Sequence, residues 1–304
     1  MADTLEQESS FERPTIPHDH SFVPFRMGIV SLGLMGGSFA KALHQAGREV
    51  YAWNRTRKTL EFAMLDSVDG EITEDTLPTL EMIVLAGYPQ AAIDWLKENA
   101  ALISPGAIVI DTVGVKQVIC DTCFDVAKDY AWHFVGCHPM AGTQYSGYAH
   151  ARANMFHKAP MVVVPPPNLT DLERLDLLDR VEQLLQPLQF GQFTYTTAAH
   201  HDEVIAFTSQ LAHVVSNAYV KSPSAQVHKG FSAGSYKDLT RVARLNAPMW
   251  TELFLDDADN LSREIGILID NLQQYKDAID QRDADRLEQL LAEGDRRKRE
   301  VEGR

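Results

Sequence analysis

Two kinds of hydrophobic pattern follow one another along the chain. From about residue 26 to 197, short apolar runs alternate with stretches in which apolar positions recur at helical spacing. The short runs are RMGIVSL, EVYAWN, MIVLAG, AIVIDTV, HFVGCHP, MVVVPP and FTYTT. Strands that alternate with helices predict a mostly parallel sheet covered by helices on both faces. We therefore expect an α/β fold for this part of the chain.

The strand pattern ends at about residue 198. The segments 198–220, 247–279 and 283–302 all carry apolar positions near helical spacing. They predict a second domain made of helices, with its longest helices near the C-terminus. The polar, proline-bearing residues 1–24 read as a flexible N-terminal tail, which leaves 25–197 for the α/β domain and 198–304 for the helical domain.

Charge and composition narrow the class of protein. The formal net charge of the 304 residues is −14, which argues against nucleic acid as a partner because phosphate backbones recruit basic surfaces. No apolar run approaches the roughly 18 residues needed to cross a bilayer. The three cysteines form no even disulfide framework and the N-terminus is no secretory signal. We expect a cytoplasmic protein without a membrane partner.

The segment MGIVSLGLMGGSFA, residues 27–40, predicts a dinucleotide-binding turn between a strand and a helix. Gly33 and Gly36 fill the second and third glycine positions of the motif G-x-G-x-x-G, whereas Ser31 replaces the first. A serine there is strained only if its φ must be positive. The alternative is an ordinary strand–helix turn. The predicted cofactor contacts are Ser31, Leu32, Gly33, Leu34, Met35 and Gly36.

The end of the second predicted strand bears on the choice of cofactor. Enzymes that use NAD usually place an Asp or Glu there to bind the ribose hydroxyls. This chain instead has Asn54, Arg55, Thr56 and Arg57. Guanidinium groups and a hydroxyl suit a 2′-phosphate, so these four residues predict NADP, with NAD as a second possibility. The alternative is a pair of solvated arginines that open a helix.

A histidine is predicted at the carboxyl end of a strand in FVGCHPMAGT, residues 134–143. Pro139 biases His138 away from helical backbone, and open α/β sheets bind their ligands at this edge. The alternative is a buried structural histidine. Cys120 and Cys123 lack a second ligand pair, so we interpret them as small buried side chains and expect no metal.

Five segments in order, GLMGGSFA, DTVGVK, GCHPMAGTQYSG, HDEVIAFTSQLAH and GSYKDLTRVA, resemble the prephenate/arogenate dehydrogenase family of tyrosine biosynthesis. The resemblance implies an N-terminal Rossmann-type dinucleotide-binding domain, followed by an all-helical dimerisation domain that makes a homodimer. It also implies oxidative decarboxylation of a cyclohexadienol. The substrate is then a dicarboxylate (prephenate) or its amino-acid analogue (arogenate).

Three catalytic residues follow from this resemblance. His138 matches the family's catalytic histidine, which takes the proton of the ring hydroxyl while hydride leaves the same carbon. Arg241 matches an arginine that binds a substrate carboxylate, and His213 matches a second histidine of the substrate site. Structural alternatives are an ion pair of Arg241 with Asp238 or Glu252, and a core position for His213.

Gly114, Lys116 and Thr143 complete the substrate site that the resemblance implies. Gly114 stands where many members carry a serine that bonds the catalytic histidine, so we expect Thr112, Thr143 or a water to substitute for it. Lys116 supplies either positive charge or structure. Two alternative functions stay open: a β-hydroxyacid dehydrogenase, because GLMG and NRT occur there too, and a non-catalytic NADP-binding protein.

Overall fold

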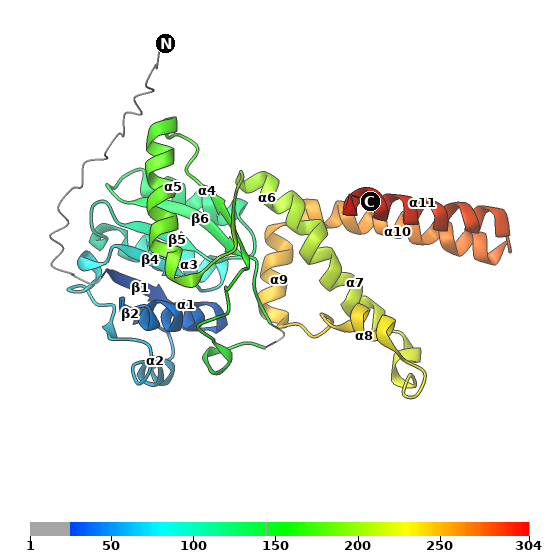
Figure 1. Cartoon of the computed structure of the whole chain (residues 1–304), viewed down its shortest axis with the longest axis horizontal. Helices are drawn as coiled ribbons and strands as arrows, with labels where there is room; N and C mark the ends of the chain where they lie inside the picture. The colour runs from blue at the N-terminus through cyan, green and yellow to red at the C-terminus, as the bar shows by residue number, and fades with distance from the viewer. Residues whose placement is uncertain (1–24, 144, 304) are drawn as a thin grey trace, which may run out of the picture.

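The computed structural model describes residues 25–143 and 145–303. The predicted flexible tail, 1–24, lies outside this part of the chain. Figure 1 shows a sheet covered by helices, followed by an elongated helical region that ends in a long hairpin. None of the helices in these ranges combines the length and apolar character needed to span a membrane.

The described strands form one sheet in the order β3-β2-β1-β4-β5-β6-β7-β8. Every neighbouring pair is parallel except β6 and β7, so the predicted mostly parallel sheet is confirmed. Seven strands match predicted apolar runs, whereas the two-residue β3 was not predicted. The bounds are β1 (Arg26–Val30), β2 (Glu49–Trp53), β3 (Gly70–Glu71), β4 (Met82–Leu85), β5 (Ile108–Asp111), β6 (His133–Pro139), β7 (Pro160–Val164) and β8 (Gln192–Tyr195).

Side chains that alternate along the strands build two cores, one on each face of the sheet. In β4, Met82 and Val84 join the first core, whereas Ile83 and Leu85 join the second. Helices α1 and α5 supply apolar side chains to the first core, and α3 and α4 to the second. The helices are α1 (Leu34–Gln45), α2 (Arg57–Ala63), α3 (Pro89–Asn99), α4 (Gln117–Ala127) and α5 (Asp171–Leu185).

Two residues separate the last strand from the helical region. Its long first helix is interrupted by a π-helical segment, η5, which sequence periodicity did not predict. The elements are α6 (Ala198–Ile205), η5 (Ala206–Leu211), α7 (Ala212–Tyr219), α8 (Gly234–Thr240), α9 (Ala247–Asp256), α10 (Ala258–Asp280) and α11 (Ala284–Glu302). The short 3₁₀ helices are η1 (Leu77–Thr79), η2 (Ala100–Leu102), η3 (Tyr148–His150), η4 (Gln186–Leu188) and η6 (Pro223–Gln226). An α/β domain followed by a helical one confirms the predicted fold class.

The helical domain is joined to the sheet domain by buried polar contacts at α6. Asp202 accepts hydrogen bonds from the backbone N–H groups of Lys116 and Gln117, at 2.7 and 2.8 Å. A second contact lies at α9, where Glu252 accepts the N–H of Gln90 at 2.8 Å. Both contacts reach the starts of α3 and α4, which follow the carboxyl ends of β4 and β5, so the helical domain lies over the ligand-binding edge of the sheet (Figure 1).

Candidate active site

Ser31 adopts the backbone conformation that the first motif glycine usually provides. Its φ is +79°, and its N–H donates to the carbonyl of Trp53 at 2.8 Å. A Cβ on Gly36 would lie 2.0 Å from the carbonyl oxygen of Ser31, so only glycine fits there. The turn therefore keeps the tight geometry of a dinucleotide-binding motif and carries its strain at the serine.

The start of α1 offers open backbone donors to an anion. Gly33 is the N-cap residue, no side chain caps the helix, and the first turn contains no acid. A Cβ added to Gly33 would meet nothing within 4 Å, so a phosphate has room to approach the backbone. The N–H of Leu32 is already bound by the Asn54 side chain at 2.8 Å. These residues fit the pyrophosphate of a nicotinamide dinucleotide.

We expect Ser31→Gly to stabilise the fold by about 1 kcal/mol, because glycine adopts a positive φ without the steric cost that serine bears. Urea unfolding followed by circular dichroism measures the change. The matched control is Ser262→Gly on the exposed face of α10, where glycine should cost about 0.5 kcal/mol instead. Equal destabilisation by both substitutions contradicts the strain at position 31.

The four residues predicted to choose the cofactor do not share one role. Asn54 bridges the turn, since its side chain accepts from Leu32 and donates to the carbonyl of Thr56 at 3.0 Å. Arg57 binds Glu71 at 2.5 Å and Glu61 at 3.1 Å, and the bond to Glu71 is the main cause that raises its pKa. Arg55 makes no hydrogen bond or ion pair with another described residue. Arg55 is therefore the guanidinium that is available for a 2′-phosphate.

His138 is the last residue but one of β6, and its two ring nitrogens have different surroundings. Its Nδ1 lies 2.9 Å from Nε2 of His201, and its Nε2 faces Gly114, where an added Cβ would lie 4.0 Å away. Burial, followed by His201 and Lys116, holds the pKa of His138 well below its ordinary value of 6.5. The imidazole is therefore neutral at physiological pH, as a general base requires.

His201 and Asp202 belong to this site but were not singled out from the sequence. His201 is 3% exposed, and its Nδ1 donates to Asp202 at 2.7 Å. The signal was present as the HD of HDEVIAFTSQLAH, one of the segments that carry the resemblance. Periodicity places these residues on a helix, but it does not show that the helix reaches the end of β6.

Lys116, predicted to touch the substrate, lies in the protein interior. Its side chain is 0% exposed, and its ammonium group binds the equally buried Asp111. Asp111 also accepts the N–H groups of Val113 at 2.8 Å and Cys137 at 2.9 Å. The complete burial of the Lys116 side chain does not favour direct contact with a substrate. Its positive charge acts on His138 at a distance, where it helps to lower the pKa.

Arg241 and His213 lie together on the helical domain. The Nδ1 of His213 donates to the carbonyl of Val242 at 3.1 Å, and its ring packs 4.0 Å from that of Trp250 on α9. Burial lowers the pKa of His213, and the charge of Arg241 lowers it further. Among the described residues Arg241 forms no ion pair, so the alternative pairing with Asp238 or Glu252 is not observed.

Helix α9 connects the two groups of predicted catalytic residues. Trp250 packs on His213, and Leu253, one turn further along α9, would contact a Cβ at Gly114 at 3.6 Å. Gly114 in turn faces His138. The exposed Thr143 lies in the loop that follows β6, where its hydroxyl accepts the N–H of Tyr145 at 3.2 Å.

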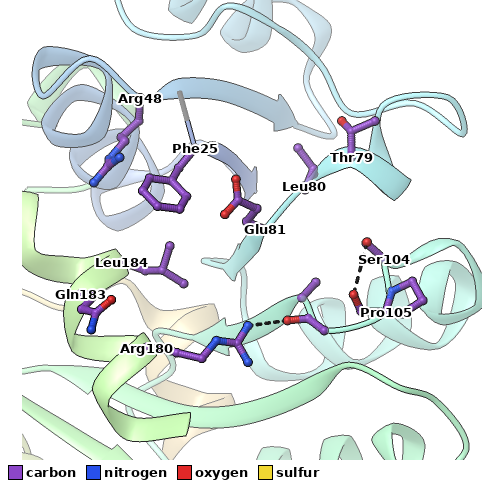
Figure 2. A pocket seen from close by; sticks show the side chains of 12 residues that line it. Phe25, Arg48, Thr79, Leu80, Glu81, Ser104, Pro105, Arg180, Gln183 and Leu184 are labelled. Carbon is purple, nitrogen blue, oxygen red and sulfur yellow. Dashed lines mark hydrogen bonds between the residues drawn. The ribbon is translucent and has the colours of Figure 1, made fainter. Parts of the chain in front are cut away.

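A cavity of about 490 Å³ lies at the other edge of the sheet. Figure 2 shows Phe25, Arg48 and Glu81 around it, which directly precede strands β1, β2 and β4. It therefore lies at the amino ends of the strands, far from His138 along β6. The described residues contain no group of three or more His, Cys, Asp or Glu side chains placed to hold a metal.

The fold and these residues define a two-domain dehydrogenase that binds a nicotinamide dinucleotide. The family model of the prephenate dehydrogenase nucleotide-binding domain matches residues 39–187, and that of the dimerization domain matches residues 197–293. The chain belongs to the prephenate dehydrogenase family, and the resemblance inferred from its sequence is confirmed. Matches to both domains favour this family over the β-hydroxyacid dehydrogenases.

Relatives from several bacteria cover nearly the whole chain. A cyclohexadienyl dehydrogenase of Zymomonas mobilis is 26% identical over 275 residues, which span 86% of this chain and 90% of that protein. The structure of Synechocystis arogenate dehydrogenase is 27% identical, with a TM-score of 0.73, over 90% of this chain and 99% of that one. A prephenate dehydrogenase of A. aeolicus, solved with hydroxyphenyl propionate and NAD⁺, is 25% identical with a TM-score of 0.78, over 93% and 100%.

We expect Gly114→Ser to raise kcat several-fold, because an added Cβ fits without a close contact and its hydroxyl would lie beside Nε2 of His138, where it can donate to the reacting oxygen of the substrate. One well-placed donor to the reacting oxygen is worth roughly 10-fold or more in favourable sites. Steady-state rates measure the effect, and Gly114→Ala is the control that adds the Cβ alone. Equal rates for the serine and alanine variants contradict a hydroxyl role at this position.

Proposed function

We propose that this protein oxidises and decarboxylates arogenate or prephenate, and that it prefers NADP as the hydride acceptor. The observation that carries the proposal is the neutral imidazole of His138, whose Nε2 faces Gly114 at the ligand-binding edge of the sheet. Arg241 and His213, which lie near each other where Trp250 of α9 packs on the His213 ring, would bind a substrate carboxylate. An arginine without an ion-pair partner suits that role.

In the proposed reaction, His138 accepts the proton of the ring hydroxyl at Nε2. The bound nicotinamide supplies the hydride acceptor. The carbinol carbon becomes a carbonyl, and the electrons of the bond to the ring carboxylate enter the ring as CO₂ leaves. Formation of the aromatic ring makes the sequence irreversible. Arg241 binds a carboxylate and so holds the hydroxyl against His138.

Arg55 supports the proposed preference for NADP. We expect Arg55→Ala to raise the KM for NADP at least about tenfold, because it removes a charge-assisted contact with the 2′-phosphate. The KM for NAD, which lacks that phosphate, should change little. The control is Arg57→Ala, since Glu61 and Glu71 already bind that guanidinium. An equal loss for both cofactors contradicts the proposed contact.

A homodimer is also part of the proposal. The helical domain exposes large apolar side chains that a second copy would cover, among them Phe231, Ile267, Ile269, Leu272, Ile279 and Leu291. The match to the dimerization domain model supports the same assembly. Cys120, Cys123 and Cys137 are free and buried, which supports a reducing compartment such as the cytoplasm.

The proposed function is tested by steady-state rates with prephenate and arogenate, each with NADP and with NAD. We expect turnover of at least one substrate, with the higher kcat/KM for NADP. Turnover of a β-hydroxyacid instead identifies the alternative enzyme class. Tight NADP binding without turnover of either cyclohexadienol identifies a non-catalytic binding protein.

A further inference from the structure

A pair of histidines crosses the boundary between the two domains. His138 comes from β6 and His201 from α6, with 2.9 Å between Nδ1 of the first ring and Nε2 of the second. The ring centroids lie 5.1 Å apart, with an interplanar angle of 60°. Because His201 is 3% exposed, its ring has little access to water. One of the two facing nitrogens must carry a proton and the other a lone pair for the hydrogen bond to form.

Asp202 fixes the proton on His201. Its Oδ1 lies 2.7 Å from Nδ1 of His201, and its two oxygens also accept the N–H groups of Lys116 and Gln117. The N-terminus of α4, where these N–H groups lie, favours a negative charge. A carboxylate only accepts hydrogen bonds, so Nδ1 of His201 carries a proton. The Nε2 of neutral His201 then carries a lone pair.

The same constraint passes to His138. Since Nε2 of His201 accepts, Nδ1 of His138 donates, and neutral His138 keeps its lone pair on Nε2, which faces Gly114. We propose that His201, anchored by Asp202, is a positioning residue that holds His138 in the tautomer able to accept the substrate proton. The identity of that proton rests on the proposed function, whereas the tautomer exists without any ligand.

Charged groups around the two histidines affect which of their ring nitrogens carry protons. When His138 gains a proton at Nε2, Asp202 stabilises the new positive charge through His201. Lys116 and Asp111 also face His201, and Asp256 and Asp257 act on Asp202 from the junction of α9 and α10. A proton on Nε2 of His201 reverses the bond: His201 then donates to Nδ1 of His138, and the lone pair facing Gly114 is lost.

The tautomer is measured in the ligand-free protein labelled with ¹⁵N in its histidine rings. At about pH 8, above the ordinary histidine pKa, nitrogen shifts should show a protonated Nδ1 and an unprotonated Nε2 for His138. The signals of His138 are assigned by their absence in His138→Asn. A protonated Nε2 on His138 overturns the proposal, whatever the protein catalyses. If neither cyclohexadienol is turned over, the proposed function fails and this spectrum still decides the tautomer.

Two substitutions of His201 separate positioning from packing. His201→Leu removes the acceptor, so we expect kcat to fall roughly 10- to 100-fold with little change in KM, and Nε2 of His138 to become partly protonated. His201→Gln keeps an acceptor oxygen near the position of Nε2, and it should restore most of kcat and the original tautomer. His200→Gln, on an exposed neighbour that is paired with Glu203, is the control. Wild-type kcat and tautomer in His201→Leu overturn the proposal.

Discussion

Replacement of His138 by Asn is expected to lower kcat by roughly 10²- to 10⁴-fold, the usual contribution of a positioned general base. Asparagine has a similar size but offers no basic lone pair at the position of Nε2. The KM for the substrate should change much less, because Arg241 still binds the carboxylate. Steady-state rates with the better of the two cyclohexadienols measure the loss.

The control for this substitution is His157→Asn, on an exposed histidine whose ring contacts Gln189 at 3.0 Å. The pH profile gives a second test, because the pKa of His138 is depressed. A base with a lowered pKa stays neutral to lower pH, so kcat/KM should keep its plateau below pH 6.5 and fall only as the pH approaches that lower value. Turnover that is unchanged in His138→Asn removes this residue from the chemistry.

Lys116→Met is expected to cost roughly 3–5 kcal/mol of folding free energy, since it leaves the buried carboxylate of Asp111 without its cation. Methionine has nearly the same length as lysine, so lost packing contributes little. Both side chains of the pair are 0% exposed, which keeps water from replacing the ammonium group. Chemical unfolding at neutral pH measures the loss, with thermal unfolding as a second probe.

Lys128→Met is the matched control, because its ion pair with Asp125 is at the surface, with side-chain exposures of 61% and 76%. Exposed pairs of this kind contribute about 0–1 kcal/mol. Comparable losses in the two variants contradict a special role for burial at Lys116. The double variant Lys116→Met with Asp111→Asn should recover part of the stability, since it removes the unpaired charge.

The sequence predicted the sheet because its central strands β1, β4 and β5 are nearly continuous apolar runs, buried on both faces. The Rossmann turn could also be predicted from local sequence. Its third motif glycine, Gly36, is required because the carbonyl oxygen of Ser31 leaves no room for a Cβ. Two elements were missed because local patterns do not encode them. Strand β3 has two residues, and the π-helical η5 lies within a run whose apolar positions are close enough to α-helical spacing to predict one continuous helix.

A residue of the candidate site could be predicted where its type and the local strand or turn pattern both indicate a ligand-binding edge. Pro139 and the end of a strand predicted His138 at a ligand-binding edge, whereas its catalytic role came from the family resemblance and stays a prediction. His201 was missed because its partner lies 63 residues earlier in the chain. The acids that bind Arg57 illustrate the same limit, since Glu71 comes from a strand that was not predicted. Pairings between distant segments depend on tertiary packing, which periodicity does not describe.

The contact of Asp202 with the start of α4 links domain association to proton chemistry. The same carboxylate joins the two halves of the chain and orders the imidazoles between them. Opening at this junction would break the hydrogen bonds that keep the proton of His138 on Nδ1. The hydrogen bonds across this junction must therefore be formed whenever His138 accepts a proton, whatever movement the two domains make between turnovers.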